Sequence, residues 1–100
     1  MILYINTKDQ KQVTVSLKED SKIIKSLNKK NEYGSQVLLP LIIKLLKTVN
    51  CKLTTLEGVE VKTGPGSFTG LRIGVSVANS LGYALETPVN GKKMETKLQY

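Results

Sequence analysis

The chain has 100 residues, of which 40% are hydrophobic and 23% charged, and this predicts a single small domain with one core. It contains one cysteine, Cys51, and no histidine, which excludes an internal disulfide and argues against zinc and against catalysis by Cys–His or Ser–His pairs. No apolar run is long enough to span a membrane, and the first residues lack the pattern of a signal peptide. We therefore expect a cytoplasmic protein.

The charge is strongly positive. Fifteen Lys and Arg residues against eight Asp and Glu give a net charge of +7, and Arg72 is the single arginine. Such a surface attracts RNA or acidic proteins without specificity. The lysines are spread along the chain, and no cluster of arginine and aromatic side chains accompanies them to stack on bases. We therefore expect direct RNA binding to be at most a secondary role.

Four segments have the patterns of β-strands. Residues 2–6 form a short apolar run typical of a strand buried on both faces. Residues 12–18 alternate polar and apolar side chains, residues 22–27 do so more weakly, and residues 58–63 alternate again. Turn-forming residues separate the first three segments, which predicts an antiparallel meander followed by a charged loop at residues 28–32.

Residues 37–47 predict a helix by their length and leucine content, within a helical stretch that reaches from Ser35, as N-cap, to Val49. Pro40 predicts an irregular first turn or a kink, because proline lacks the N–H that a helix bond requires. Apolar side chains occupy more than one side of this helix. We therefore expect it to be covered on two sides.

Residues 64–85 predict a tight turn followed by a long helix. Two glycines flank Pro65, a combination that favours a turn with positive φ at a glycine, and Ser67 or Thr69 can serve as the N-cap. Small residues recur at every fourth position and share one side of the helix: Gly70, Gly74, Ala78 and Gly82. An interior glycine costs a helix roughly 1 kcal/mol relative to alanine. Either this side packs closely on its own sheet, or it docks a helix of another protein.

The predicted order is β-β-β-α-β-α, with one more short strand at residues 88–90, and it indicates an α/β domain with a mixed sheet. We expect residues 1–90 to form a single unit. Residues 91–100 contain too few apolar side chains to need a place in the core, so we expect a flexible or loosely docked tail.

Candidate chemistry is limited to the turn before the second helix. N–H groups at a helix N-terminus can bind phosphate, but the turn lacks the Lys-Ser or Lys-Thr pair of a Walker A loop and the spacing of a dinucleotide-binding loop. It is a structural turn or a weak phosphate site, made of Gly64, Pro65, Gly66, Ser67, Phe68 and Thr69. No two carboxylates are placed for joint acid–base work. We expect no catalytic residue and no metal ligand.

Three segments together resemble the TsaB family of bacterial tRNA threonylcarbamoyladenosine biosynthesis proteins. They are Ile2-Leu3-Tyr4-Ile5-Asn6-Thr7, Gly34-Ser35-Gln36-Val37-Leu38-Leu39-Pro40, and residues 64–74 with their Gly-Pro-Gly-Ser-Phe-Thr-Gly run. The last segment is a long and specific match, and the resemblance spans nearly residues 1–90. It implies the N-terminal lobe of an actin-like, ribonuclease-H-like ATPase fold and a non-catalytic scaffold function.

The resemblance also implies partners. TsaB proteins support TsaD, the subunit that transfers threonylcarbamoyl to tRNA, and the small ATPase TsaE joins the complex, so tRNA is met indirectly. The contact with TsaD resembles a helix bundle built from the two helices of the lobe, and the same helices would form a homodimer when the partner is missing. The expected interface residues are Leu38, Leu41, Ile42, Leu45, Gly70, Leu71, Arg72, Gly74, Val75, Ala78 and Gly82.

Two departures from the family pattern bear on cofactors. Asn6 stands where family members usually have an aspartate, which in working relatives helps to hold metal and nucleotide. The second lobe that normally follows is not in this sequence. We therefore expect no cofactor. The alternative function is a small phosphate- or nucleotide-binding enzyme that uses the Gly64 turn and Arg72.

Overall fold

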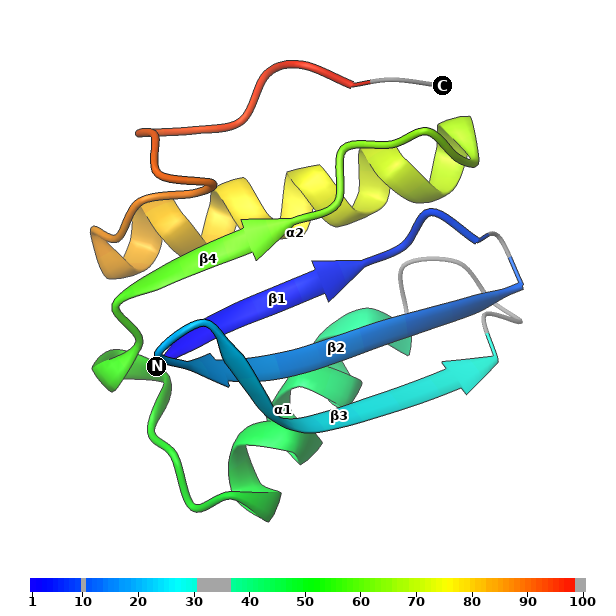
Figure 1. Ribbon diagram of the computed structural model, residues 1–100. Coiled ribbons are helices and arrows are strands. Elements are labelled where there is room, and N and C mark those ends of the chain that lie inside the picture. Colours follow the sequence, from blue (N-terminus) through cyan, green and yellow to red (C-terminus); the bar gives the residue numbers. More distant parts are fainter. Residues whose placement is uncertain (10, 31–36, 99–100) are drawn as a thin grey trace.

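The computed structural model describes residues 1–9, 11–30 and 37–98. They form one four-stranded sheet with the strand order β3-β2-β1-β4 (Figure 1). The strands are β1 (Ile2–Asn6), β2 (Gln12–Glu19), β3 (Lys22–Lys30) and β4 (Gly58–Val61). The first three are antiparallel neighbours, whereas β4 pairs in parallel with β1. The expected mixed sheet and antiparallel meander are therefore confirmed.

Strand β3 is longer than its sequence pattern suggested. Residues 28–30, expected in a charged loop, continue the pairing with β2 as far as the Gln12–Lys30 pair. β3 is an edge strand whose side chains are nearly all exposed. Lysine is common on such edges because its charge prevents another strand from adding to the sheet. Backbone pairing with β2, rather than an apolar pattern, sets the length of this strand.

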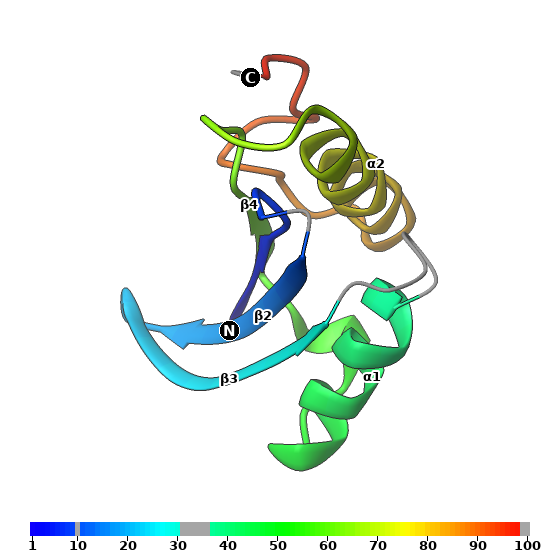
Figure 2. The same ribbon diagram turned by 90° about the vertical axis from the view of Figure 1, so that its right-hand side faces the viewer.

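Both helices, α1 (Leu38–Thr48) and α2 (Phe68–Leu85), cover the same face of the sheet (Figure 2). Pro40 falls in the first turn of α1, where an N–H has no partner within the helix in any case, so the expected loss of a helix bond does not occur. The expected N-cap Ser35 lies outside the described residues. The N-cap position is taken by Val37, which makes no capping bond through its side chain.

The core lies between this sheet face and the two helices. Alternate residues of β1, β2 and β4 point into it, as the register shows by placing Leu3 beside both Leu17 and Val59. The other residues of β1, such as Tyr4, are only half-buried. β1 is therefore buried on one face, and the prediction of burial on both faces was wrong.

The segment after α2 docks through the buried side chain of Val89 and through polar contacts. Val89 forms a single parallel bridge to Val59 in place of the short strand expected at residues 88–90. The side-chain amide of Asn90 then bonds both backbone groups of Val61, at 2.8 and 3.1 Å. The chain returns along α2 (Figure 1), where the Asn79 amide accepts from the Glu95 N–H and donates to its carbonyl, both at 2.8 Å. Hydrophobic content does not reveal such a tail contact.

Candidate functional site

The turn before α2 is closed against the end of β1. The Ser67 N–H donates to the Lys8 carbonyl at 2.8 Å, and the buried Thr7 hydroxyl donates to the Gly70 carbonyl at 2.5 Å. Ser67 is the N-cap, because its Oγ accepts from the Gly70 N–H at 3.2 Å. In the segment that the turn contacts, the Asn6 side chain accepts a hydrogen bond from the Lys8 N–H at 3.1 Å.

This closure bears on the expected phosphate contact. The N–H groups of Ser67 and Gly70 already bond within the chain. A Cβ at Gly66 would lie 2.7 Å from both the Cβ and the carbonyl oxygen of Lys8, so glycine is needed for close packing of two backbone segments. Close packing and capping therefore explain the glycine and the serine of this turn. The geometry adds no support for phosphate binding.

The small-residue side of α2 faces its own chain. A Cβ added at Gly70 would overlap the Thr7 carbonyl oxygen, and one at Gly74 would overlap the Thr7 hydroxyl. At the other end of the helix, a Cβ at Gly82 would overlap a methyl group of Val89. Of the two readings that the sequence left open, close packing on the sheet and its flanking segments explains this side. The sequence did not predict that Thr7 and Val89 contact these glycines, because no local pattern around either residue indicates it.

Ten of the eleven expected interface residues lie inside the core rather than on a surface. In α1 they are Leu38, Leu41, Ile42 and Leu45; in α2 they are Gly70, Leu71, Gly74, Val75, Ala78 and Gly82. They face the sheet because both helices bury their most apolar or smallest side against it. Only Arg72 is exposed. A partner would have to contact the side chains next to these residues.

Those neighbouring side chains form an outer helix face, which we define by Leu39, Ile43, Phe68, Arg72, Ile73, Ser76 and Val77. Leu39, Ile43 and Phe68 are 47%, 52% and 52% exposed, a high fraction for large apolar side chains on two adjacent helices. A groove of about 440 Å³ lies on this face, between Leu39 of α1 and the Arg72–Val77 segment of α2. This groove is the candidate binding site.

Arg72 lies at the groove with its guanidinium 5.2 Å from the centroid of the Phe68 ring. This distance is within the range of a cation–π contact. The contact lies near the start of α2, where a cation is opposed by the helix dipole and gains from a nearby anion. The arrangement can bind an apolar surface that carries a negative charge.

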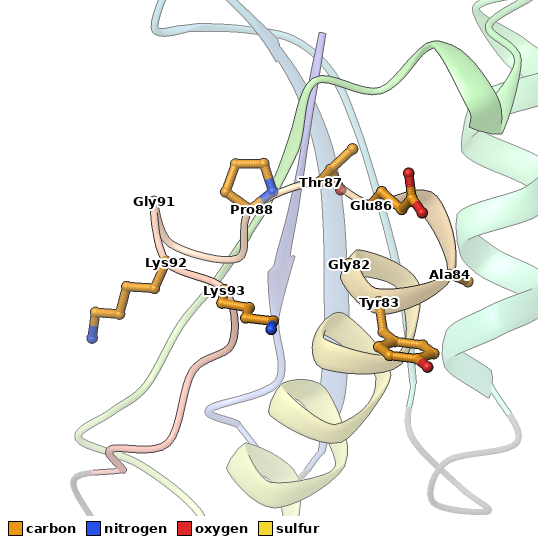
Figure 3. Close-up of a pocket in the computed structure, with 9 residues that line it drawn as sticks. All are labelled: Gly82, Tyr83, Ala84, Glu86, Thr87, Pro88, Gly91, Lys92 and Lys93. Carbon is orange, nitrogen blue, oxygen red and sulfur yellow. The ribbon is translucent and has the colours of Figure 1, made fainter.

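A second hollow, of about 790 Å³, lies at the opposite end of α2 (Figure 3). Its walls are the last turn of the helix, the loop that follows it and the turn at Gly91–Lys93. The Gly82 and Tyr83 carbonyls at this end already accept backbone bonds. Lys92 is 2.8 Å from the Glu95 carboxylate. Because these two carbonyls and this lysine already have partners, we prefer the outer helix face as the candidate binding site.

The carboxyl group of Glu95 has a perturbed pKa. The Lys92 ammonium lowers the pKa of the Glu95 carboxyl from its ordinary value, with help from Asn90, although burial acts in the opposite direction. The backbone N–H of Glu95 donates to the side chain of Asn79 on α2. Within residues 1–9, 11–30 and 37–98, no three His, Cys, Asp or Glu side chains gather where they could hold a metal, and no helix could cross a membrane.

Comparison with known proteins places this fold and its turn in a family. The family model described as "TsaD: tRNA N6-adenosine threonylcarbamoyltransferase" matches residues 29–91. The chain is 39% identical over 57 residues to the "tRNA threonylcarbamoyladenosine biosynthesis protein TsaB" of Escherichia coli K12, a match that covers 57% of this chain and 25% of that protein. The chain belongs to the TsaB family.

Two further comparisons agree with this assignment. The Bacillus subtilis protein of the same name is 32% identical over 89 residues, covering 89% of this chain and 39% of its own length. YeaZ from Pseudomonas aeruginosa superposes with a TM-score of 0.78 at 29% identity, over 88% of this chain and 41% of that one. This TsaB-family chain thus has the expected actin-like, ribonuclease-H-like fold. It spans less than half the length of these relatives.

Proposed function

We propose that this TsaB-family chain is a non-catalytic scaffold in the synthesis of threonylcarbamoyladenosine in tRNA, and that it docks a TsaD-like partner on its outer helix face. The names of the relatives support the pathway. The observation that carries the docking proposal is the groove on two helices whose large apolar side chains remain exposed. Contact with tRNA would then be made through the complex.

The composition of α1 explains why this face suits a helical partner. One side of the helix is buried against the sheet, whereas Leu39 and Ile43, four residues apart, stand together on another side. A helix with apolar side chains on two sides is normally covered on both. A partner helix laid into the groove would cover the second side, as in other helix-in-groove contacts.

The scaffold role is supported by what the described residues offer for chemistry. In the turn before α2, the Ser67 N–H bonds the Lys8 carbonyl just after β1, and the Gly70 N–H bonds the Ser67 side chain. Asn6, in the place where a metal-binding aspartate would stand, accepts a bond from the Lys8 N–H. Glu95, whose pKa is lowered, docks the tail. These named groups are therefore engaged in contacts that hold the fold together.

The test is capture of the TsaD-like protein of the same organism by purified wild-type and variant chains. Ile43→Glu places a charge on the outer helix face and is expected to weaken binding at least about tenfold. Ile23→Glu is the matched control, because Ile23 is 56% exposed but lies on the edge strand β3. Both variants should keep the wild-type melting temperature. Equal binding by both variants, or no binding by the wild type, would contradict the docking proposal.

A further inference from the structure

We propose that lysines of β3 and α1 form a basic strip that contacts the phosphate backbone of RNA without reading its sequence. The strip consists of Lys25, Lys29, Lys44 and Lys47. The inference rests on the proposed function for its occupant, because that function concerns tRNA, and it adds a direct secondary contact to the one made through the complex. Three observations carry it: the place of these lysines in the fold, the groove between them, and the charges around them.

The fold gathers lysines that are spread along the sequence. In the ladder of β2 and β3, Lys25 is paired with Leu17 and Lys29 with Val13, and both of these partners are buried in the core. Directly paired residues point to the same face of a sheet, so the two exposed lysines stand on the face that the helices cover. Helix α1 packs against β3 along this edge of the sheet and adds its own two exposed lysines (Figure 2).

A groove of about 330 Å³ lies between the two elements. Lys29 of β3 and Lys44 of α1 are among the residues that line it. The groove of the outer helix face is lined by a different residue of α1, Leu39, together with α2, so the strip stays accessible when a protein covers that face. Lys25 and Lys29 are four residues apart on a strand, which separates them by about 13 Å. This length suits a chain of phosphates rather than one phosphate group.

The charges of the strip are not balanced by nearby carboxylates. β3 contains four lysines and α1 two, and neither element contains an Asp or Glu. Within the described part of the chain, Glu57, Glu60 and Glu95 form the ion pairs, and none of these pairs includes a lysine of β3 or α1. Glu19 is paired with Lys22 in the ladder, and Lys22 is therefore left out of the strip. A surface of one sign attracts a polyanion.

The residue types of the strip favour phosphate over other anions. A lysine ammonium is a compact charge with rotatable donors, whereas arginine makes the paired contact that fixes a carboxylate. The single arginine, Arg72, lies on α2, and β3 and α1 contain no aromatic side chain that could stack on a base. Binding is therefore electrostatic and independent of base sequence. This agrees with the secondary role in RNA binding that the composition predicts.

The experiment measures binding of a labelled, unmodified tRNA transcript to the purified chain by fluorescence anisotropy, over a series of salt concentrations. For the wild type, log K against log salt should fall with a slope of about −3, as expected for four phosphate contacts. The double variant Lys29→Gln/Lys44→Gln should bind at least about tenfold more weakly, with a slope smaller in magnitude by about 1.5.

The matched control is Lys93→Gln/Lys97→Gln, which removes the same charge from two exposed lysines of the tail. It should change tRNA binding by less than about twofold. Both double variants should keep the wild-type melting temperature. An equal loss of affinity in the two double variants would overturn the strip, because total charge alone would then explain binding. A wild type that does not bind tRNA, or that binds without salt dependence, would also overturn it.

Two further measurements identify the occupant and separate this proposal from the docking proposal. Polyglutamate should bind the wild type more weakly than the tRNA transcript does; tighter binding would overturn RNA in favour of an acidic protein. Lys29→Gln/Lys44→Gln should capture the TsaD-like protein as the wild type does, and Ile43→Glu should keep tRNA binding within about threefold. Loss of tRNA binding with capture intact counts for the strip, whereas failed capture with unchanged tRNA binding counts against the docking proposal alone.

Discussion

Helix α2 has a buried side that packs against its own chain and an exposed side. Its inner side carries Gly70, Gly74, Ala78 and Gly82, all buried, and at the three glycines a single added carbon would overlap atoms of Thr7 or Val89. Its outer side carries Arg72, Ser76, Ser80 and Tyr83, all exposed. Substitutions on the inner side should therefore change the stability of the fold, and substitutions on the outer side should change binding.

The inner side itself differs from one end to the other. Near the start of α2, Gly70 meets the backbone carbonyl of Thr7, the residue that directly follows β1. Near the end of α2, the atom nearest to a Cβ at Gly82 is a side-chain methyl carbon of Val89, and the backbone carbonyl oxygen of Thr87 is next, at 3.0 Å. A backbone neighbour makes glycine obligatory, whereas a side-chain neighbour can be changed by a second substitution.

The largest expected effect follows from Gly70→Ala. The added Cβ would overlap the Thr7 carbonyl oxygen and disturb the Thr7 hydroxyl bond to the Gly70 carbonyl. We expect a loss of about 3 kcal/mol or more in the free energy of unfolding, despite the roughly 1 kcal/mol that alanine contributes by helix propensity. Urea unfolding followed by circular dichroism measures it. Ser76→Ala, on the outer side, is the control and should stay within about 0.5 kcal/mol of the wild type.

A smaller and repairable effect is expected at Gly82. Gly82→Ala should cost about 1–2 kcal/mol because the new methyl group overlaps Val89, and Val89→Ala alone should cost about 2 kcal/mol by emptying part of the core. The double variant should lose about 1 kcal/mol less than the sum, since each change relieves the other. Strict additivity in urea unfolding would show that Val89 does not set the need for glycine here.

Much of the fold could be predicted from the sequence because its signals are local. Alternation identified β2 and β4, and the Gly-Pro-Gly turn with Ser67 or Thr69 as candidate N-cap marked the start of α2, where Ser67 is the N-cap. The small-residue side was also visible, but its partners were not. Thr7 is 63 residues from Gly70 in the sequence, and a contact at that distance leaves no local pattern. For the same reason the buried side of α1 could not be distinguished from its exposed side.

The polar contacts of the tail could not be predicted, because polar pairing has no periodicity, and they act beside Leu98, which packs against the core. Residues 91–98 contain few apolar side chains, yet Glu95 is only 6% exposed and bonds through its backbone to Asn79. Its carboxylate lies 2.8 Å from the Lys92 amine. An amide and an ion pair thus supply what apolar side chains supply elsewhere. The flank of α2 is a third region, neither packed like the inner side nor open like the outer side.

The smallest expected effect concerns this flank and depends on pH. Lys92 lowers the pKa of Glu95 from the ordinary 4.5, so the folded state favours the ionised carboxyl. The resulting stability is fully present above the ordinary pKa and is lost as the pH falls through the lowered pKa of the folded state. Because Lys92 is half exposed, the contribution should be at most about 1 kcal/mol.

The measurement compares urea unfolding at neutral pH and at acidic pH, below the pKa of folded Glu95, for the wild type and Glu95→Gln. The glutamine side chain cannot ionise, so the variant should lose less stability on acidification than the wild type does. Lys92→Met should shift the acid transition of Glu95 toward its ordinary pKa, which separates the ion pair from the effect of burial. Glu60→Gln is the matched control, since it removes the other close lysine pair, Glu60 with Lys18, on the sheet. An identical acid loss in the wild type and in Glu95→Gln would mean that the backbone bonds to Asn79 hold the tail without help from the charge.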